Sequence, residues 1–345
     1  MQHLLDFERP IAELDALIEE LKSRANDPEQ RSDAIARSFD LDAEIARIEI
    51  QRDKVMHQVF DNLTPWNQVQ MARHPLRPYT LDYIRLMFDQ FTELHGDRIN
   101  ADDQAIVGGM ARFQGECVMV IGHQKGRDLR DRQVRNFGSA RPAGFRKALR
   151  LMEMAARFGK PIITLIDTPA AEANLMAEEE GISRAIAQNL EAMFKLPVPI
   201  IVAIIGEGGS GGALGIAVGD RVLMMEHAIY SVIPPESCAA ILSEFGRDRA
   251  NAPQAAAALK ITAAHAHKFE VVDEVLVEPL GGAHREPHTA ASTLAAALSR
   301  NLHDLKKMKP AKLMEHRYER FRKLGQWLDP EALILEATAK PANRN

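Results

Sequence analysis

Residues 206–212 read Gly-Glu-Gly-Gly-Ser-Gly-Gly and directly follow the unbroken apolar run 200–205. We call them the glycine turn. Glycines let a backbone approach a ligand closely and adopt positive φ where a turn requires it. If a helix begins in this turn, its first peptide N–H groups have no acceptor within the helix and are free to bind an anion. Such donors stabilise an enolate or a tetrahedral oxyanion without any side chain, so the turn is predicted to be an oxyanion site. The alternative is close helix–sheet packing, to which Gly212 and Gly215 could belong, and both roles are compatible.

The glycine turn also contains a literal G-x-G-x-x-G, at Gly206, Gly208 and Gly211, with Glu226 twenty residues after the first glycine. This pattern is typical of an NAD-dependent oxidoreductase. Only residues 212–218 can be helical before the chain turns again, whereas a dinucleotide-binding unit needs a longer helix. The oxidoreductase therefore stays a remote alternative. A Walker-type phosphate loop is excluded, because alanine follows the last glycine where that loop requires lysine.

A basic segment precedes the predicted helix 142–158. Its cationic residues are Lys125, Arg127, Arg130, Arg132, Arg135 and Arg141, offset only by Asp128 and Asp131. Three interpretations are open: a solvated face or subunit contact, a clamp for a small anionic substrate, or a nucleic-acid surface. Nucleic-acid binding would usually add exposed aromatic side chains, and only Phe137 and Phe145 lie nearby, which disfavours the third.

No side-chain nucleophile or metal-binding motif can be identified. Cys117 and Cys238 are far apart and form no C-x-x-C pair, so each is interpreted as a small core residue in a reducing compartment. The histidines at 123, 265, 267 and 284 are isolated and form no H-x-x-x-H pattern. This absence favours catalysis by backbone donors.

The surrounding pattern predicts an α/β fold that places these segments together. Apolar runs predict strands at 105–113, 116–122, 161–166, 199–205, 221–225, 228–233 and 271–277. Helical spacing predicts helices at 142–158, 181–196, 251–268, 289–308 and 312–323. Alternation of strands and helices implies a largely parallel sheet with right-handed crossovers. The segments 123–126, 167–170 and 206–212 should then meet outside the carboxyl ends of three strands, where ligands bind in open α/β sheets.

The first hundred residues predict a helical extension. Apolar residues at helical spacing lie on both sides of a polar break at 25–33, which indicates a hairpin of two helices that turns at 26–28. A proline-rich connector at 74–78 precedes a helix predicted over 81–94 and capped by Thr80. We therefore expect three parts: the extension 1–100, a catalytic domain 101–325 and a C-terminal tail 326–345.

The composition agrees with a cytoplasmic globular protein. The chain has 345 residues, 46% hydrophobic and 26% charged, with a formal net charge of −5. Its acidic balance argues against a protein that binds nucleic acid or membrane surfaces as a whole. No apolar run approaches the roughly 20 residues that span a bilayer. The N-terminus lacks the basic and apolar regions of a secretory signal.

Six segments together resemble one family. They are LDFERPIAEL at 5–14, ARHPLRPYTLDYI at 72–84, IGHQKGR at 121–127, RNFG at 135–138, IGEGGSGGAL at 205–214 and EPLGGAHR at 278–285. In this order, over nearly the whole chain, they resemble the alpha subunit of the bacterial acetyl-CoA carboxylase carboxyltransferase.

The resemblance implies a crotonase-like β-β-α superhelix with a helical N-terminal extension. It implies a heterotetramer of two alpha and two beta subunits, in which the beta subunit carries a zinc ribbon and this chain binds no metal. The family moves a carboxyl group from carboxybiotin, held on a biotin carboxyl carrier protein, to acetyl-CoA, giving malonyl-CoA for fatty acid synthesis. Biotin carboxylase and its ATP belong to the full complex, and no cofactor is bound in this chain.

The resemblance also assigns residues. Gly211 and Gly212 would donate their N–H groups to the carbonyl oxygen of carboxybiotin. Gly208, Gly209 and Ser210 would shape the turn. The remaining predicted substrate-binding residues lie at the other two strand ends and are Lys125, Arg127, Asp167, Thr168, Pro169 and Ala170.

The chain departs from the family pattern mainly at residues 170–176. After Asp-Thr-Pro the family usually reads GAYPGVGAE, whereas this chain reads AAEANLMAE. Glycines that tolerate positive φ are replaced by Ala170, Asn174 and Met176, and Glu172 adds a carboxylate near a site meant for an anion. A smaller departure is PPESC at 234–238, where the family tends to have SPEGC. Two hypotheses follow: an active subunit with a remodelled pocket, or a paralogue that assembles with the beta subunit but has weak or no activity.

Overall fold

The structure is a computed structural model that describes residues 3–28 and 40–325. The predicted tail 326–345 and the greater part of the polar break 25–33 lie outside the described residues. Within the described ranges, no helix combines the length and apolar character needed to cross a membrane.

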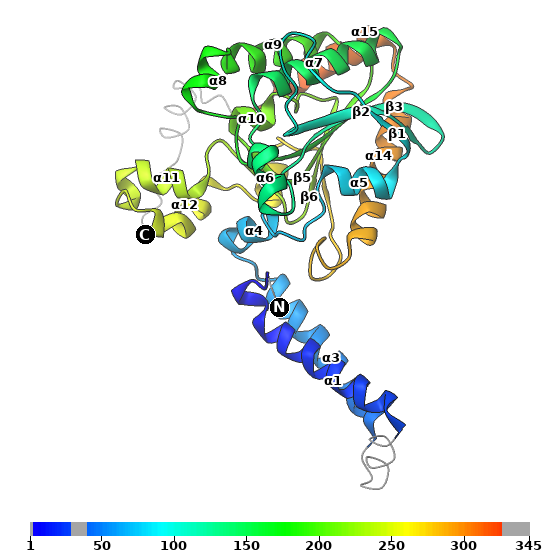
Figure 1. Cartoon of the computed structure of the whole chain (residues 1–345), viewed down its shortest axis with the longest axis vertical. Coiled ribbons are helices and arrows are strands. Elements are labelled where there is room, and N and C mark those ends of the chain that lie inside the picture. The colour runs from blue at the N-terminus through cyan, green and yellow to red at the C-terminus, as the bar shows by residue number, and fades with distance from the viewer. Residues whose placement is uncertain (1–2, 29–39, 326–345) are drawn as a thin grey trace, which may run out of the picture.

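The N-terminal extension begins with the predicted helical hairpin. After a 3₁₀ turn, η1 (Asp6–Glu8), the helices α1 (Arg9–Asn26) and α3 (Leu41–Phe60) lie side by side and project from the rest of the molecule (Figure 1). Ile18 and Leu21 of α1 pack on Ile45 and Ile48 of α3. The periodicity that predicted two helices reflects this shared apolar seam.

The segment between the hairpin and the sheet differs from the prediction. A short helix that the sequence interpretation missed, α4 (Pro65–Ala72), is marked by a capping box in which Thr64 and Asn67 bond each other's backbone N–H. The prediction of a helix over 81–94 is wrong in its second half. Helix α5 (Thr80–Met87) ends at Met87, and the chain continues as strand β1 (Asp89–Glu93). Strand β1 can pair with β2 because Gly109 has no side chain: a Cβ there would lie 2.0 Å from the Thr92 carbonyl oxygen.

All strands belong to one mixed sheet of eight strands in the order β1-β2-β3-β4-β5-β6-β8, with β7 paired to β5. The strands after β1 are β2 (Ile106–Phe113), β3 (Glu116–His123), β4 (Ile162–Thr168), β5 (Ile200–Gly209), β6 (Arg221–Met225), β7 (Ile229–Ser231) and β8 (Glu274–Leu276). The pairs β1/β2 and β2/β3 are antiparallel, and the other pairs are parallel. Every residue of β4 and β5 is buried, as their continuous apolar runs predict.

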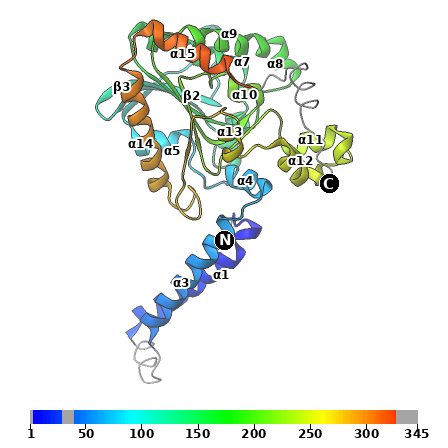
Figure 2. The ribbon, with the colours of Figure 1, turned by 180° about the vertical axis from the view of Figure 1, so that it is seen from behind.

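Helices cover both faces of the sheet. Helices α7 (Pro142–Arg157) and α9 (Ile182–Lys195) pack together on one face, with α15 (Pro310–Arg322) against α9, while α5 and α14 (Pro287–Leu305) cover the other (Figures 1 and 2). The remaining helices are α6 (Leu129–Val134), α8 (Leu175–Glu179), α10 (Ser210–Leu214), α11 (Pro235–Ile241), α12 (Ala252–Leu259) and α13 (Ala263–Lys268), with the 3₁₀ turns η2 (Asn136–Gly138), η3 (Ser243–Phe245) and η4 (Arg249–Asn251). The single helix predicted over 251–268 is divided into α12 and α13 at Lys260, whose φ is 52°.

A buried ion pair fastens α15 to the sheet. The side chains of Arg317 and Asp220 are both fully buried, and the guanidinium donates to both carboxylate oxygens, at 2.9 and 2.7 Å. It also donates to the carbonyl oxygens of Leu196 and Val198, at 3.0 and 2.9 Å. One arginine thus satisfies the polar backbone of the loop that leads from α9 into β5.

Replacing Arg317 by methionine should therefore lower the free energy of unfolding by about 3–5 kcal/mol, because Asp220 would stay buried without its counter-charge. Urea unfolding followed by circular dichroism measures this loss. Lys312→Ala, an exposed change on the same helix, serves as the matched control and should change stability by less than about 0.5 kcal/mol. Equal effects of the two substitutions would contradict the assignment.

Candidate active site

Three strand ends meet at one edge of the sheet, as the sequence predicts. Strands β3, β4 and β5 are parallel neighbours that end at His123, Thr168 and Gly209. Thr168 lies opposite Gly208 across the β4/β5 pair. The segments predicted to converge therefore do so at the carboxyl ends of the strands.

The glycine turn begins inside the strand. The sequence places the end of the strand at residue 205, but β5 extends to Gly209 and α10 starts at the next residue, Ser210. Ser210 has a φ of 51°, a left-handed conformation that few non-glycine residues adopt. This single residue turns the chain from strand to helix, and it leaves the first N–H groups of α10 at the edge of the sheet.

Most glycines of the turn are required by packing. A Cβ on Gly209 would lie 1.8 Å from the carbonyl oxygen of Pro169, and one on Gly212 would lie 2.4 Å from the backbone nitrogen of Ala171. Gly211 is different: the nearest atom to its Cβ position is a methyl carbon of Ile186 at 3.6 Å. The close-packing interpretation therefore holds for Gly209 and Gly212, whereas the turn is open at Gly211.

A buried charge network supports the turn from below. Asp167 Oδ1 lies 2.7 Å from Lys125 Nζ and accepts the Glu207 backbone N–H at 2.9 Å. The Glu207 carboxylate lies 2.7 Å from Arg73 Nη2 and 3.4 Å from Lys125 Nζ. Arg73 also bonds Glu236 at 2.5 Å, which connects α4 to the start of α11. The network thus links all three strand-end segments to the N-terminal extension.

The network fixes the charge of its members. Burial alone would raise the pKa of Glu207, but the positive charges of Lys125 and Arg73 outweigh it and lower that pKa. Burial would likewise lower the pKa of Lys125, whereas Asp167 and Glu207 raise it. Both side chains are therefore charged near neutral pH, and the Lys125 amine is not a base for proton transfer.

Sequence reasoning missed Arg73, Glu207 and Glu236. Each lies within or beside a segment that was singled out for another reason: the ARHPLRP connector, the glycine turn and the PPESC stretch. Each is a charged residue in a segment that was already of interest, and this could have marked it as a candidate. Nothing in the spacing of the three residues indicates that they are neighbours in the fold.

A second buried arginine holds the strand just before the turn. Arg77 Nε donates to the Ile205 carbonyl oxygen at 2.7 Å, and its other nitrogens bond both oxygens of Glu278. Glu278 also accepts the backbone N–H groups of His227 and Ala283, at 3.0 and 2.7 Å. Burial alone would raise the pKa of Glu278, but Arg77 outweighs it and holds that pKa at about 2. The HPLRP and EPLGGAHR segments therefore meet beside β5, next to the residue that precedes the glycine turn.

The altered loop 170–176 folds without glycine. None of its residues has a positive φ, and Asn174 caps α8 by accepting the Ala177 N–H at 2.8 Å. Glu172 N–H donates to the Ala140 carbonyl oxygen at 2.9 Å, and its carboxylate accepts from the Asn136 amide. Thr168 Oγ1 bonds the Gly138 and Ala170 carbonyl oxygens, at 2.7 and 2.8 Å. The loop therefore needs no glycine and is held by side-chain contacts, including the one from Glu172 to the RNFG segment.

The predicted substrate cations are engaged within the chain. Lys125 belongs to the network above. Arg127 stacks its guanidinium 4.0 Å from the centre of the Tyr79 ring and bonds Asp82 and the Pro75 carbonyl oxygen. Arg135 pairs with Asp131 at 2.7 Å. A role for Lys125 and Arg127 toward a substrate remains a proposal, and the structure places both in contacts that hold the strand-end loops.

Of the four histidines singled out in the sequence, His123 is the one at a strand end, and His284 pairs with Glu8 at 3.2 Å. His123 is fully buried, and burial, reinforced by the Lys125 charge, lowers its pKa to about 3. Its ring is neutral near pH 7, so it supports the strand ends by packing.

Within the described residues, one group of three could in principle hold a metal ion: Glu8, His74 and His284. His74 Nδ1 accepts the Leu76 N–H at 3.2 Å, so its Nε2 carries the proton and bonds the His3 carbonyl oxygen at 2.8 Å. Both nitrogens of His74 are occupied, and this set does not fit a metal. We interpret it as a hydrogen-bonded junction between hairpin and sheet.

The dinucleotide interpretation is not supported. Helix α10 has five residues, and Gly206 and Gly208 lie within β5 rather than in a loop after it. Glu226, the expected ribose ligand, accepts the Glu278 N–H at 2.9 Å between β6 and the loop after β8. The geometry needed for a pyrophosphate at a long helix is absent from this part of the described chain.

Replacing Lys125 by methionine should lower the free energy of unfolding by about 3–5 kcal/mol, since Asp167 and Glu207 would lose a buried counter-charge. The pKa of the Glu207 carboxyl would rise without the Lys125 charge, so the deficit relative to the unchanged protein should shrink as the pH falls from 8 to 5. Urea unfolding at the two pH values measures it. Arg127→Met, in the same basic segment but partly exposed, is the control and should cost less than about 1 kcal/mol. A pH-independent deficit for Lys125→Met would contradict the network.

Comparisons with known proteins find relatives over nearly the whole chain. The family model described as acetyl co-enzyme A carboxylase carboxyltransferase-like matches residues 4–325. The acetyl-coenzyme A carboxylase carboxyl transferase subunit alpha of Geobacter metallireducens is 52% identical over 95% of this chain and 99% of its own length. The protein of the same name from Picosynechococcus is 50% identical over 94% of this chain and 97% of its own.

Solved structures share the fold at low identity. A crystal structure of transcarboxylase 12S matches with a TM-score of 0.52 and 21% identity, over 64% of this chain and 41% of that chain. The beta subunit of Pseudomonas aeruginosa geranyl-CoA carboxylase matches with a TM-score of 0.52 and 14% identity, over 69% and 44%. The chain therefore has the predicted crotonase-like fold and belongs to the family of acetyl-CoA carboxylase carboxyltransferase alpha subunits, which are biotin-dependent carboxyltransferases.

Proposed function

We propose that this chain supplies the biotin side of a carboxyltransferase site shared with a beta subunit, in an assembly of two alpha and two beta subunits. The carboxyl group passes from carboxybiotin, on a biotin carboxyl carrier protein loaded by biotin carboxylase, to acetyl-CoA, giving malonyl-CoA for fatty acid synthesis. The zinc expected in the assembly lies on the beta subunit, and we expect the complex in the cytoplasm. The match to the family over residues 4–325 supports this assignment.

The observation that carries the proposal is the asymmetry of the glycine turn. Gly209 and Gly212 are packed against the backbone of residues 169–171, whereas Gly211 is only partly buried, and a Cβ there would make an ordinary van der Waals contact with the Ile186 side chain, at 3.6 Å. The turn is thus held rigidly on one side and accessible on the other. Rigid, preorganised donors are what stabilise charge that develops on an oxygen during a reaction.

In this proposal the N–H groups of Gly211 and Gly212 donate to the ureido oxygen of carboxybiotin. Their donation stabilises the electron pair that biotin nitrogen receives when its bond to the carboxyl carbon breaks. Gly208, Gly209 and Ser210 set the direction of the donors. Asp167 to Ala170 form the neighbouring wall, and Lys125 and Arg127 keep that wall in place.

The hypothesis of an inactive paralogue gains no support from the altered loop. Residues 170–176 adopt ordinary backbone conformations and keep the contact of residues 169–171 with the turn. Glu172 points its carboxylate to the Asn136 amide, which reduces its repulsion toward an anionic substrate. We therefore favour an active subunit whose pocket wall differs in shape.

The isolated chain should form no malonyl-CoA from carboxybiotin and acetyl-CoA, and activity should appear when a cognate beta subunit is added. The reason is that the turn offers donors for one oxyanion, and the thioester enolate of acetyl-CoA needs a second set. Chromatographic separation of acyl-CoA products measures the reaction, with the beta subunit alone as the control. Turnover by the isolated chain would contradict a shared site.

Gly211→Val should lower kcat of the assembled enzyme by about 100-fold, because its side chain would crowd the two donors without touching the backbone beneath. Stability and assembly should be retained. Gly212→Val should instead destabilise the chain, since its Cβ meets Ala171. Leu214→Ala, an exposed change on the same helix, is the activity control. A Gly211→Val enzyme with unchanged kcat would show that these N–H groups are not the donors.

A further inference from the structure

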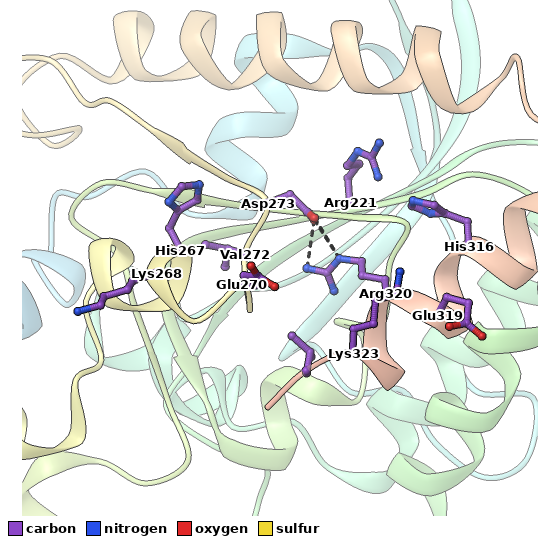
Figure 3. A pocket seen from close by; sticks show the side chains of 11 residues that line it. Arg221, His267, Lys268, Glu270, Val272, Asp273, His316, Glu319, Arg320 and Lys323 are labelled. Atoms are coloured by element: carbon purple, nitrogen blue, oxygen red, sulfur yellow. Dashed lines mark hydrogen bonds and ion pairs between the residues drawn. The ribbon is translucent and has the colours of Figure 1, made fainter. Parts of the chain in front are cut away.

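A cavity lies at the opposite end of the sheet from the glycine turn. It has a volume of about 560 Å³, in the range of small-molecule sites. The last turns of α15 form one wall, the end of α13 and the segment before β8 form another, and Arg221 at the start of β6 lies between them (Figure 3).

The strand register separates this cavity from the site described above. Arg221 lies opposite Ile201 on β5, and Gly209 follows eight residues further along the same strand. At about 3.3 Å per residue the two sites are roughly 26 Å apart. A ligand in the cavity therefore cannot contact the glycine turn.

The lining carries an excess of positive charge. Its ionic residues are the cations Arg221, Lys268, Arg320 and Lys323 against the carboxylates Glu270, Asp273 and Glu319. Asp273 is already engaged, because it accepts from Arg320 Nε at 3.1 Å and from the Val222 N–H at 2.6 Å. No hydrogen bond or ion pair within residues 3–28 and 40–325 engages the side-chain ammonium of Lys268 or Lys323, two exposed residues that line the cavity from separate elements, α13 and the end of α15.

Two buried nitrogens in this cavity lack an acceptor. The Arg320 side chain is only 9% exposed and donates through Nε to Asp273 and through Nη2 to the Val271 carbonyl oxygen. Its Nη1 is buried and has no partner among the described residues, and neither has Nδ1 of His316. His316 precedes Arg320 by four residues, so both side chains leave α15 on the same face. Neither nitrogen has accessible surface, so a ligand reaches them only when the guanidinium or the imidazole ring turns toward the cavity. A buried guanidinium N–H without an acceptor is costly, which favours such a turn when a ligand supplies the acceptor.

We propose that this cavity is a binding site for a small phosphate-bearing molecule. Arg320 Nη1 and the His316 ring are the buried donors, and Lys268 and Lys323 provide charge from the two walls. A phosphate group presents several acceptor oxygens in a tetrahedral arrangement, which suits donors that converge from separate elements. The cavity is larger than one phosphate, so the ligand carries a second phosphate or an organic group beside it.

The neighbouring charges agree with an anionic ligand. Burial, together with the Arg221 guanidinium, lowers the pKa of His316. The ring is therefore neutral near pH 7 and able to donate one N–H without adding charge. Glu270 and Glu319 remain in the lining, where they can accept hydrogen bonds from hydroxyl groups of the ligand.

The test is isothermal titration of the full chain with inorganic pyrophosphate, and in parallel with citrate as a carboxylate of comparable charge. We expect pyrophosphate to bind with a Kd below about 1 mM and citrate at least 10-fold more weakly. Lys323→Ala and Lys268→Ala should each weaken pyrophosphate at least 3-fold. Lys312→Ala, an exposed lysine on α15 that does not line the cavity, should leave the Kd unchanged.

Three results would overturn the proposal: no binding of pyrophosphate at 10 mM or below, equal weakening by Lys312→Ala and Lys323→Ala, or citrate binding as tightly as pyrophosphate. His316→Phe adds a further arm, because it keeps the ring and removes the donor. It should weaken pyrophosphate binding while circular dichroism shows an unchanged fold. Unaltered binding in that variant would also contradict the assigned donors.

Discussion

The active edge of the sheet depends on one buried carboxylate. Asp167, at the end of β4, receives the Lys125 ammonium from beyond β3 and the Glu207 N–H from β5. A charge that is fully buried must be paired and hydrogen-bonded, or its desolvation would destabilise the fold. A lysine is therefore needed at 125, and glycine is needed at 206, where a Cβ would lie 2.4 Å from the Asp167 oxygen. Several features of the site follow from this single requirement.

Arginines from outside the sheet donate to backbone carbonyl oxygens that the side chains of the strands cannot satisfy. Arg77 donates to the last carbonyl oxygen before the glycine turn, and Arg317 donates to carbonyl oxygens of the loop that enters β5. Strands buried on both faces have no polar side chains of their own to satisfy such groups, and the guanidinium offers five donors in a fixed geometry. Residues far from β5 in sequence thus hold the loop that enters it and the point where it passes into the glycine turn. The N-terminal connector belongs to the support of the site, although it carries none of its donors.

The two ends of the sheet differ in the kind of polar group they leave unpaired. At the carboxyl end, the start of α10 offers backbone N–H groups beside a network whose charges are balanced by partners. At the amino end, Arg320 and His316 offer buried side-chain donors in a cavity with excess positive charge. Backbone donors suit a partial charge that appears during a reaction, whereas a guanidinium suits a permanent anion. In our two proposals, the fold thus separates a place for chemistry from a place for binding.

The sequence was informative wherever a local pattern has one physical solution. Apolar runs located the central strands, and the helical periodicity of the hairpin located α1 and α3. It failed where distant pairing decides the outcome. Residues 89–93 look like the end of a helix, yet they form β1, because the adjacent β2 backbone at Gly109 leaves room for them. The replaced glycines in 170–176 suggested strain that the structure lacks, since Glu172 and Asn174 provide the bonds that shape the loop.

By itself, then, the sequence determined the class of fold, the meeting of three strand ends at one edge, and the glycine turn as the candidate donor. These depend on periodicity, burial and backbone freedom, which are properties of neighbouring residues. Only the tertiary structure decided that Gly211 is the open position, that Lys125 pairs with Asp167, and that Arg73 and Glu207 belong to the same network. Such contacts join residues as much as 134 positions apart, and no spacing along the chain encodes the geometry of a pair that only folding brings together.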